Sequence, residues 1–175
     1  MVVTGTVLGG TVPGWKFWTD DPDEYAIGVD DAVEHDGHAT GFLRSLVEQP
    51  AMGGRVELRR SLNPARYRGK RLRVRALIKA DRVEWAALSG SVEVGCNPDF
   101  HDDEIRGSSD WTPHEIALDV WAATRAIEYE VRLYGGGQVW IDGVRVDVVG
   151  DATPPSTGAR TGADHGCCTK GDLPY

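Results

Sequence analysis

The chain has 175 residues, a formal net charge of −8 and a hydrophobic content of 41%. This size fits one domain with a two-layer core, and the acidic balance argues against nucleic acid, which concentrated basic surfaces bind. No apolar run approaches the roughly 20 residues that span a bilayer, and the opening residues MVVTGTVLGG lack the pattern of a signal peptide. The sequence therefore predicts a cytoplasmic protein without a nucleic-acid or membrane partner.

Three cysteines are too few for a disulfide framework, and two of them, Cys167 and Cys168, are adjacent. Neighbouring cysteines close only a strained ring, so free thiols in a reducing compartment are expected. His165 precedes this pair, but the spacing matches no zinc-binding pattern.

The first half of the chain has the pattern of short strands separated by turns. Strands are expected over residues 2–8, 25–29, 39–46, 55–62 and 70–79. An irregular segment over residues 10–24 separates the first two, and Asp36-Gly37 favours a tight reversal between the next two. In the strand over 70–79, Leu72, Val74, Ala76 and Ile78 alternate with polar residues and predict one buried face.

The second half continues the pattern after a strand over residues 85–94 and a long loop over 95–110. Three runs between residues 114 and 149 alternate apolar and polar residues with period two, and Gly135-Gly136-Gly137 permits a tight hairpin between the last two. About nine strands predict an all-β fold, a jelly-roll antiparallel β-sandwich over residues 1–149. The tail over 150–175 contains too few large apolar residues to offset its ordering entropy and is expected to be disordered.

Four segments carry a resemblance to a known type of domain: EYAIGVDDAVEHDGHATGFLRS, YRGKRLRVRALIK, SSDWTPHEIALDV and GGGQVWIDGVRVDVV. Together they resemble bacterial jelly-roll domains similar to galactose-binding-like carbohydrate-binding modules, and the resemblance covers residues 14–149. Such domains also form the ligand-sensing part of some transcriptional regulators, and the fold type is similar to that of cofactor-free cyclases in natural-product pathways. Because one fold hosts unrelated functions, the function has to be argued from the site.

The predicted catalytic residues are His101, Asp102, Glu104 and Glu93. The first three lie in the expected 95–110 loop, where a histidine beside carboxylates is the usual composition for general acid–base catalysis. The alternative is a solvated acidic loop.

An aromatic group near the N-terminus, Trp15, Phe17, Trp18 and Tyr25, is predicted to bind substrate. Aromatic faces stack on sugars or enclose apolar molecules, and the three residues 15, 17 and 18 are expected to roof a pocket bordered by the 95–110 loop. The alternative is a small satellite core beneath an N-terminal loop.

A third candidate is the set of polar residues opposite the core face on successive strands: Glu57, Arg59, Arg73, Arg75, Ser89, Ser91, Glu93, Glu130 and Arg132. On a concave sheet these side chains would converge on a groove floor, whereas on a convex sheet they would form a solvated ion-pair face. Two of them, Arg75 and Ser89, are predicted to bind substrate together with Trp140.

The resemblance also implies a structural calcium ion. Asp142, together with Asp30 or Asp31, would supply the oxygen ligands. No other cofactor is expected, because the chain lacks a phosphate-binding glycine motif. It also lacks a nucleophile turn, so a serine or cysteine triad is not expected.

Two functions from different classes remain at this stage. The first is a cofactor-independent cyclase or isomerase for a hydrophobic or polycyclic intermediate of bacterial specialised metabolism, acting by enforced conformation. The second is a non-catalytic module that binds a carbohydrate or metabolite. Either would act on a small molecule as a monomer or homodimer.

Overall fold

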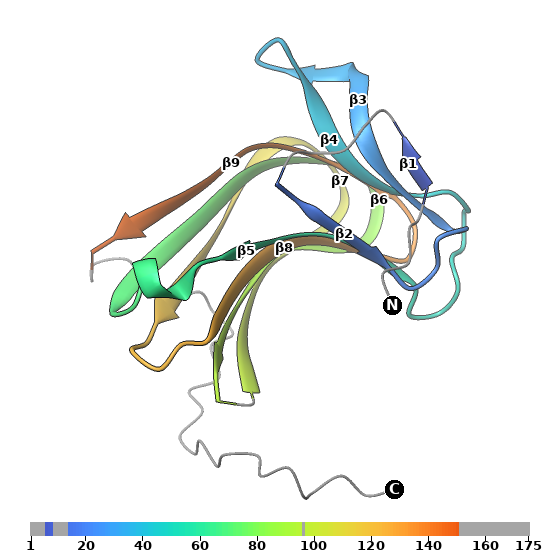
Figure 1. Ribbon diagram of the computed structural model, residues 1–175. Helices are drawn as coiled ribbons and strands as arrows, with labels where there is room; N and C mark the ends of the chain where they lie inside the picture. The colour runs from blue at the N-terminus through green and yellow to red at the C-terminus, as the bar shows by residue number, and fades with distance from the viewer. Residues whose placement is uncertain (1–5, 9–13, 96, 151–175) are drawn as a thin grey trace, which may run out of the picture.

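The computed structural model describes residues 6–8, 14–95 and 97–150. Within them the chain forms nine β-strands and one short 3₁₀ helix (Figure 1). The strands are β1 Thr6–Leu8, β2 Lys16–Thr19, β3 Tyr25–His35, β4 His38–Ser45, β5 Arg55–Leu62, β6 Lys70–Val94, β7 Asn97–Val120, β8 Ala126–Tyr134 and β9 Gln138–Val149, and the 3₁₀ helix is Pro64–Arg66. The predicted all-β fold is confirmed.

The strands are hydrogen-bonded in the order β1-β3-β4-β9-β6-β8-β5-β2, and β7 pairs with β6. The first part of β6 pairs with β9 and the second part with β8, and the register shifts between Ile78 and Ala86. This bend carries the β6–β7 hairpin from one layer of the sandwich into the other. The β9 layer comprises β1, β3, β4, β9, residues 70–80 of β6 and residues 109–120 of β7. The β8 layer comprises β2, β5, β8, residues 83–94 of β6 and residues 97–107 of β7.

The core lies between the two layers and follows the predicted alternation. Leu72, Val74, Ala76 and Ile78 are all buried in the β9 layer, where Ile116, Leu118 and Val120 of β7 join them. The β8 layer contributes Val56, Leu58, Leu88, Ile127, Tyr129, Val131 and Leu133. A side chain at Gly90 would place its Cβ 2.6 Å from Cδ1 of Ile116, so this glycine permits the close approach of the two layers.

Two segment predictions are wrong. Residues 70–79 and 85–94 belong to one strand, because the chain bends at residues 80–85 without leaving the sheet. Residues 97–110 of the predicted 95–110 loop are part of strand β7: His101 and Ile105 alternate into the interior, with 3% and 5% exposure, while β6 supplies the backbone partners. The inward positions include the polar residues His101 and Asp103, so the sequence shows no apolar period of two there.

The aromatic segment near the N-terminus is also more regular than predicted, because β2 pairs with β5 from Lys16 to Thr19. The turn at Asp36-Gly37 is confirmed, and both residues have a positive φ. Residues 151–175 of the predicted disordered tail, which include Cys167, Cys168 and His165, lie outside the described residues, as does Cys96.

The β8 layer is strongly curved. Its strands bend together, so that the face turned away from the β9 layer is concave (Figure 1). We call this surface the concave face. In the described part of the chain no helix is long and apolar enough to cross a membrane.

Candidate functional site

Two cross-strand rows of side chains, all polar except Ala87, cover the concave face. One row runs Arg59, Glu130, Ser89, Asp102 through β5, β8, β6 and β7, each residue directly opposite the next. The adjacent row runs Glu57, Arg132, Ala87, Glu104 through the same strands. Because directly opposite residues share a face and alternate residues return to it, strand pairing alone gathers these groups.

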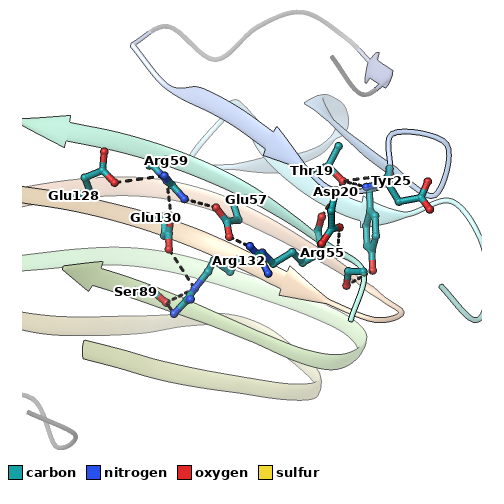
Figure 2. A network of polar contacts seen from close by, with 12 residues as sticks. Thr19, Asp20, Tyr25, Arg55, Glu57, Arg59, Ser89, Glu128, Glu130 and Arg132 are labelled. Atoms are coloured by element: carbon teal, nitrogen blue, oxygen red, sulfur yellow. Dashed lines mark hydrogen bonds and ion pairs between the residues drawn. The ribbon is translucent and has the colours of Figure 1, made fainter. Parts of the chain in front are cut away.

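Four charged side chains of the two rows form a continuous network together with Arg55 (Figure 2): Glu57, Arg59, Glu130 and Arg132. Arg55 Nε donates to Glu57 Oε1 at 2.9 Å, and Arg59 Nη2 donates to Glu57 Oε2 at 2.5 Å. Arg59 Nε also donates to Glu130 Oε2 at 2.8 Å, while Arg132 Nε lies 3.3 Å from Glu130 Oε1. These contacts link two buried carboxylates through three guanidinium groups.

Arg132 extends the network across β6 to β7. Its Nε and Nη2 donate to Ser89 Oγ at 3.0 and 2.8 Å, and its Nη2 donates to Asp102 Oδ1 at 2.6 Å. At the opposite side Glu128 accepts from Ser61 Oγ at 3.0 Å and lies 3.5 Å from Arg59 Nη1. The polar surface therefore spans four strands.

The carboxylates at the centre of this network are shielded from solvent. Glu57 and Glu130 are only 3% and 7% exposed. Burial, reinforced by repulsion from Glu57, raises the pKa of Glu130 above its ordinary value despite the neighbouring arginines. Burial opposes the charge on Arg59, but Glu130 and Glu57 outweigh it and raise the pKa of its guanidinium. Charges this deep are tolerated only because they are paired.

Aromatic rings lie at both ends of the concave face. The guanidinium of Arg55 lies 4.5 Å from the ring centre of Trp18, and Trp85 meets Tyr134 edge to face at 5.0 Å. At the hairpin end of β6 and β7, Phe100 is 49% exposed. Exposed aromatic faces beside paired polar groups are typical of sites that bind hydroxylated molecules.

A depression of about 250 Å³ lies at this hairpin end of the concave face. It is lined by Arg59, Ser91, Glu93, Pro98, Phe100, Ala126, Glu128 and Glu130. A second depression of about 490 Å³ lies elsewhere, between the β4–β5 connection, the bend of β6 and the β8–β9 turn. We call it the turn depression; Leu46, Glu48, Arg82 and Gln138 are among its lining residues.

The polar residues that the sequence places opposite the core face lie on two different surfaces. Glu57, Arg59, Ser89, Glu130 and Arg132 lie on the concave face, as expected for a groove floor, and not on a solvated convex face. Arg73 and Arg75 lie on the outer surface of the β9 layer, where both contact Asp147. The bend of β6 separates the two groups.

The predicted catalytic residues do not converge on one place. His101 points between the layers, is 3% exposed, and its Nε2 lies 3.3 Å from Asp99 Oδ2. Its neighbour Asp102 points to the concave face and binds Arg132. Adjacent residues of a strand face opposite sides, so the predicted histidine–carboxylate group is not formed.

The remaining two residues of the predicted catalytic set lie apart on the concave face. Glu104 makes an exposed ion pair with Arg106 at 3.5 Å. Glu93 lines the depression at the hairpin end.

The predicted aromatic roof is not formed, because Phe17 and Trp18 alternate on β2. Phe17 packs against the core, as does Trp15, whose ring meets Tyr129 at 5.4 Å. Only Trp18 faces the network. Tyr25 is fully buried and donates to Gly54 O at 2.7 Å, and burial raises its pKa to about 12. Tyr25 is therefore a core residue.

The three aspartates predicted to bind calcium lie near the outer surface of the β9 layer. Asp30 Oδ2 accepts from Trp140 Nε1 at 2.8 Å, and this hydrogen bond lowers the pKa of Asp30. Asp142 Oδ2 lies 2.7 Å from Nδ1 of His35, and Asp31 is exposed. Within residues 14–95 and 97–150, no cluster of three or more His, Cys, Asp or Glu side chains is placed to hold a metal ion.

Four important residues of the site are not among the candidates from the sequence: Arg55, Trp85, Phe100 and Glu128. Period two from Trp85 to Glu93 would have placed Trp85 on the same face as Ser89. Phe100 lies in the segment that the sequence predicts to be a loop, so the alternation of a strand does not reveal it.

No protein-family model matches the chain. It is 31% identical over 147 residues to an uncharacterized HTH-type transcriptional regulator of Bacillus subtilis, YbfP. The match covers 81% of this chain and 50% of the regulator, so the chain spans about half the length of that relative.

Several solved carbohydrate-binding modules have a similar structure at low sequence identity. The CBM22-1 xylan-binding domain of Paenibacillus barcinonensis Xyn10C has a TM-score of 0.56 at 12% identity, covering 82% of this chain and 90% of that one. The C-terminal family 22 module of Clostridium thermocellum Xyn10B has a TM-score of 0.57 at 13% identity, covering 82% and 92%. TmCBM61, solved with β-1,4-galactotriose, has a TM-score of 0.51 at 16% identity, covering 78% and 90%. The chain therefore has the jelly-roll sandwich fold of carbohydrate-binding modules.

Proposed function

We propose that this protein is a non-catalytic binding module whose concave face holds an oligosaccharide or a similarly hydroxylated metabolite. The observation that carries the proposal is the array of paired guanidinium and carboxylate groups, bordered by aromatic rings, on the curved layer of this fold. Planar charged groups bind neighbouring hydroxyls in two-point hydrogen bonds, and aromatic rings pack on the C–H faces of sugar rings.

The geometry favours binding over catalysis. The predicted acid–base histidine points into the sandwich, away from the concave face, and Glu57 and Asp102 on that face are held by arginines. The fold likeness to the xylan-binding domain and to the galactotriose complex favours a carbohydrate ligand, and the likeness to a transcriptional regulator favours a sensing role. These findings support the binding module better than the cyclase.

Calorimetric titration of the full chain with xylohexaose and β-1,4-galactotriose tests this proposal. We expect Phe100→Ala and Trp85→Ala each to weaken binding by about 5-fold or more, because losing a ring contact of about 1 kcal/mol changes affinity by that factor. Phe100 is half exposed, so its truncation tests binding without risk to the fold.

Trp140→Ala is the matched control, because Trp140 lies in the β9 layer and bonds Asp30 there. Its affinity should stay at the wild-type value, with thermal melting as the check that each variant is folded. Failure of both sugars to bind at millimolar concentration, or loss of binding in Trp140→Ala with Phe100→Ala unaffected, would overturn the proposal.

A further inference from the structure

The arginines of the concave face have their charge already balanced. Arg55, Arg59 and Arg132 contact Glu57, Glu130 and Asp102, so these three cations match three anions. Arg55 also stacks on Trp18, and Arg132 also bonds Ser89. An anionic ligand would have to displace one of these internal carboxylates. The network is thus poorly suited to uronic acids, sulfates and phosphates.

Two further carboxylates give the depression at the hairpin end an excess of negative charge. Glu93 lines it, and its carboxylate makes no hydrogen bond or ion pair within residues 14–95 and 97–150. Glu128 has only a long ion-pair contact of 3.5 Å with Arg59 and a hydrogen bond of 3.0 Å from the hydroxyl of Ser61. Ionised carboxylates accept hydrogen bonds and cannot donate them, so the depression requires a ligand that donates.

The apolar part of the same depression is formed by Pro98, Phe100 and Ala126. An exposed ring beside the free carboxylate of Glu93 and the weakly paired carboxylate of Glu128 attracts a cation by both the ring face and the charge. We infer that the module recognises a glycan or polyol bearing a primary amine, with the ammonium group held between Glu93 and Glu128 and the ring carbons against Phe100. This inference rests on the proposed function, because it specifies the ligand of the same surface.

Titration with three tetrasaccharides at pH 6 tests the inference: a β-1,4-glucosamine tetramer, its fully N-acetylated form, and a tetragalacturonate. The glucosamine tetramer should bind at least about 5-fold more tightly than the acetylated form at low salt, and the ratio should approach one in 1 M NaCl because salt screens exposed charges. The tetragalacturonate should bind most weakly of the three.

Two variants separate a local effect from the overall acidity of the chain. Glu93→Gln should reduce the preference for the amine, measured as the affinity ratio of the glucosamine tetramer to its acetylated form, to less than half of the wild-type value. Glu104→Gln, which removes an equal charge from the same face but outside the depression, should leave the preference as it is.

The outcomes distinguish a failure of the amine inference from a failure of the binding proposal. Equal binding of the amine and acetylated forms, tighter binding of the uronate, or equal effects of the two Gln variants would overturn the amine inference while the binding proposal stands. Absence of binding by all three tetrasaccharides and by the two neutral sugars of the preceding experiment would overturn both.

Discussion

At the scale of single residues, the defining feature is a pair of buried carboxylates that contact arginines on the curved β8 layer. Glu57 and Glu130 lie under Arg59, which contacts both. Such groups add little net stability, because the cost of removing them from water offsets their attraction. Their value lies in position: side chains fixed by several partners present a rigid surface to a ligand.

Glu130 predicts a specific dependence of stability on pH. Burial raises its pKa in the folded state, whereas an unfolded glutamate titrates near about 4.3. Its stabilising contribution is therefore complete below that pH and is lost as pH rises through the folded-state pKa. The free energy of unfolding of the wild type, relative to Glu130→Gln, should fall between pH 4 and pH 7.

Urea titration of both proteins across that range measures the difference. A difference that grows with pH would mean that Arg59 and Arg132 stabilise the carboxylate more than burial penalises it, and would contradict this description of the network.

At the scale of elements, the turn between β8 and β9 holds three parts of the fold together. Ser45 N donates to Gly137 O at 2.9 Å, and Glu84 N donates to Gly136 O at 3.0 Å. These bonds join the end of β4 and the bend of β6 to the glycine turn. The turn was predicted from the glycine triplet, but its contacts with β4 and β6 join residues far apart in the chain and have no local signal.

Gly137→Ala should destabilise the fold by at least about 2 kcal/mol. Gly137 has a φ of +116°, and a Cβ there would lie 2.6 Å from the Cα of Val83, so both the backbone and the β6 bend would have to shift. Gly107→Ala is the matched control: it has a φ of +73° and open space around the Cβ position, so it should cost only about 1 kcal/mol. Equal urea midpoints for the two variants would show that the turn does not constrain the bend.

The strands differ in how well the sequence pattern predicts them. Alternation located the buried faces of β6, β8 and the second half of β7, because each has one strictly apolar side. Alternation did not predict the first half of β7 as a strand, because its inward positions include His101 and Asp103 beside Ile105. The site was predicted only as a set of outward polar residues, because a one-dimensional pattern cannot show that β6 changes layers between Arg75 and Ser89.

At the scale of the whole molecule, one bent hairpin produces both a core and a curved outer surface. The β6–β7 hairpin supplies strands to both layers, and the curvature of the β8 layer makes its outer face concave (Figure 1). We propose that the ligand binds at the concave face. The alternative binding location on the same molecule is the turn depression, which is lined by Ser45, Gly137 and Gln138 among others.

The most direct test is a nuclear magnetic resonance titration of the ¹⁵N-labelled chain with xylohexaose, β-1,4-galactotriose and the glucosamine tetramer, following backbone amides and arginine side chains. Binding at the concave face predicts the largest shifts at Arg59, Ser89, Glu130, Arg132 and Phe100, which lie on four neighbouring strands. Shifts confined to Ser45–Glu48 and Gly136–Gln138, or no shifts with any of the three sugars, would contradict it.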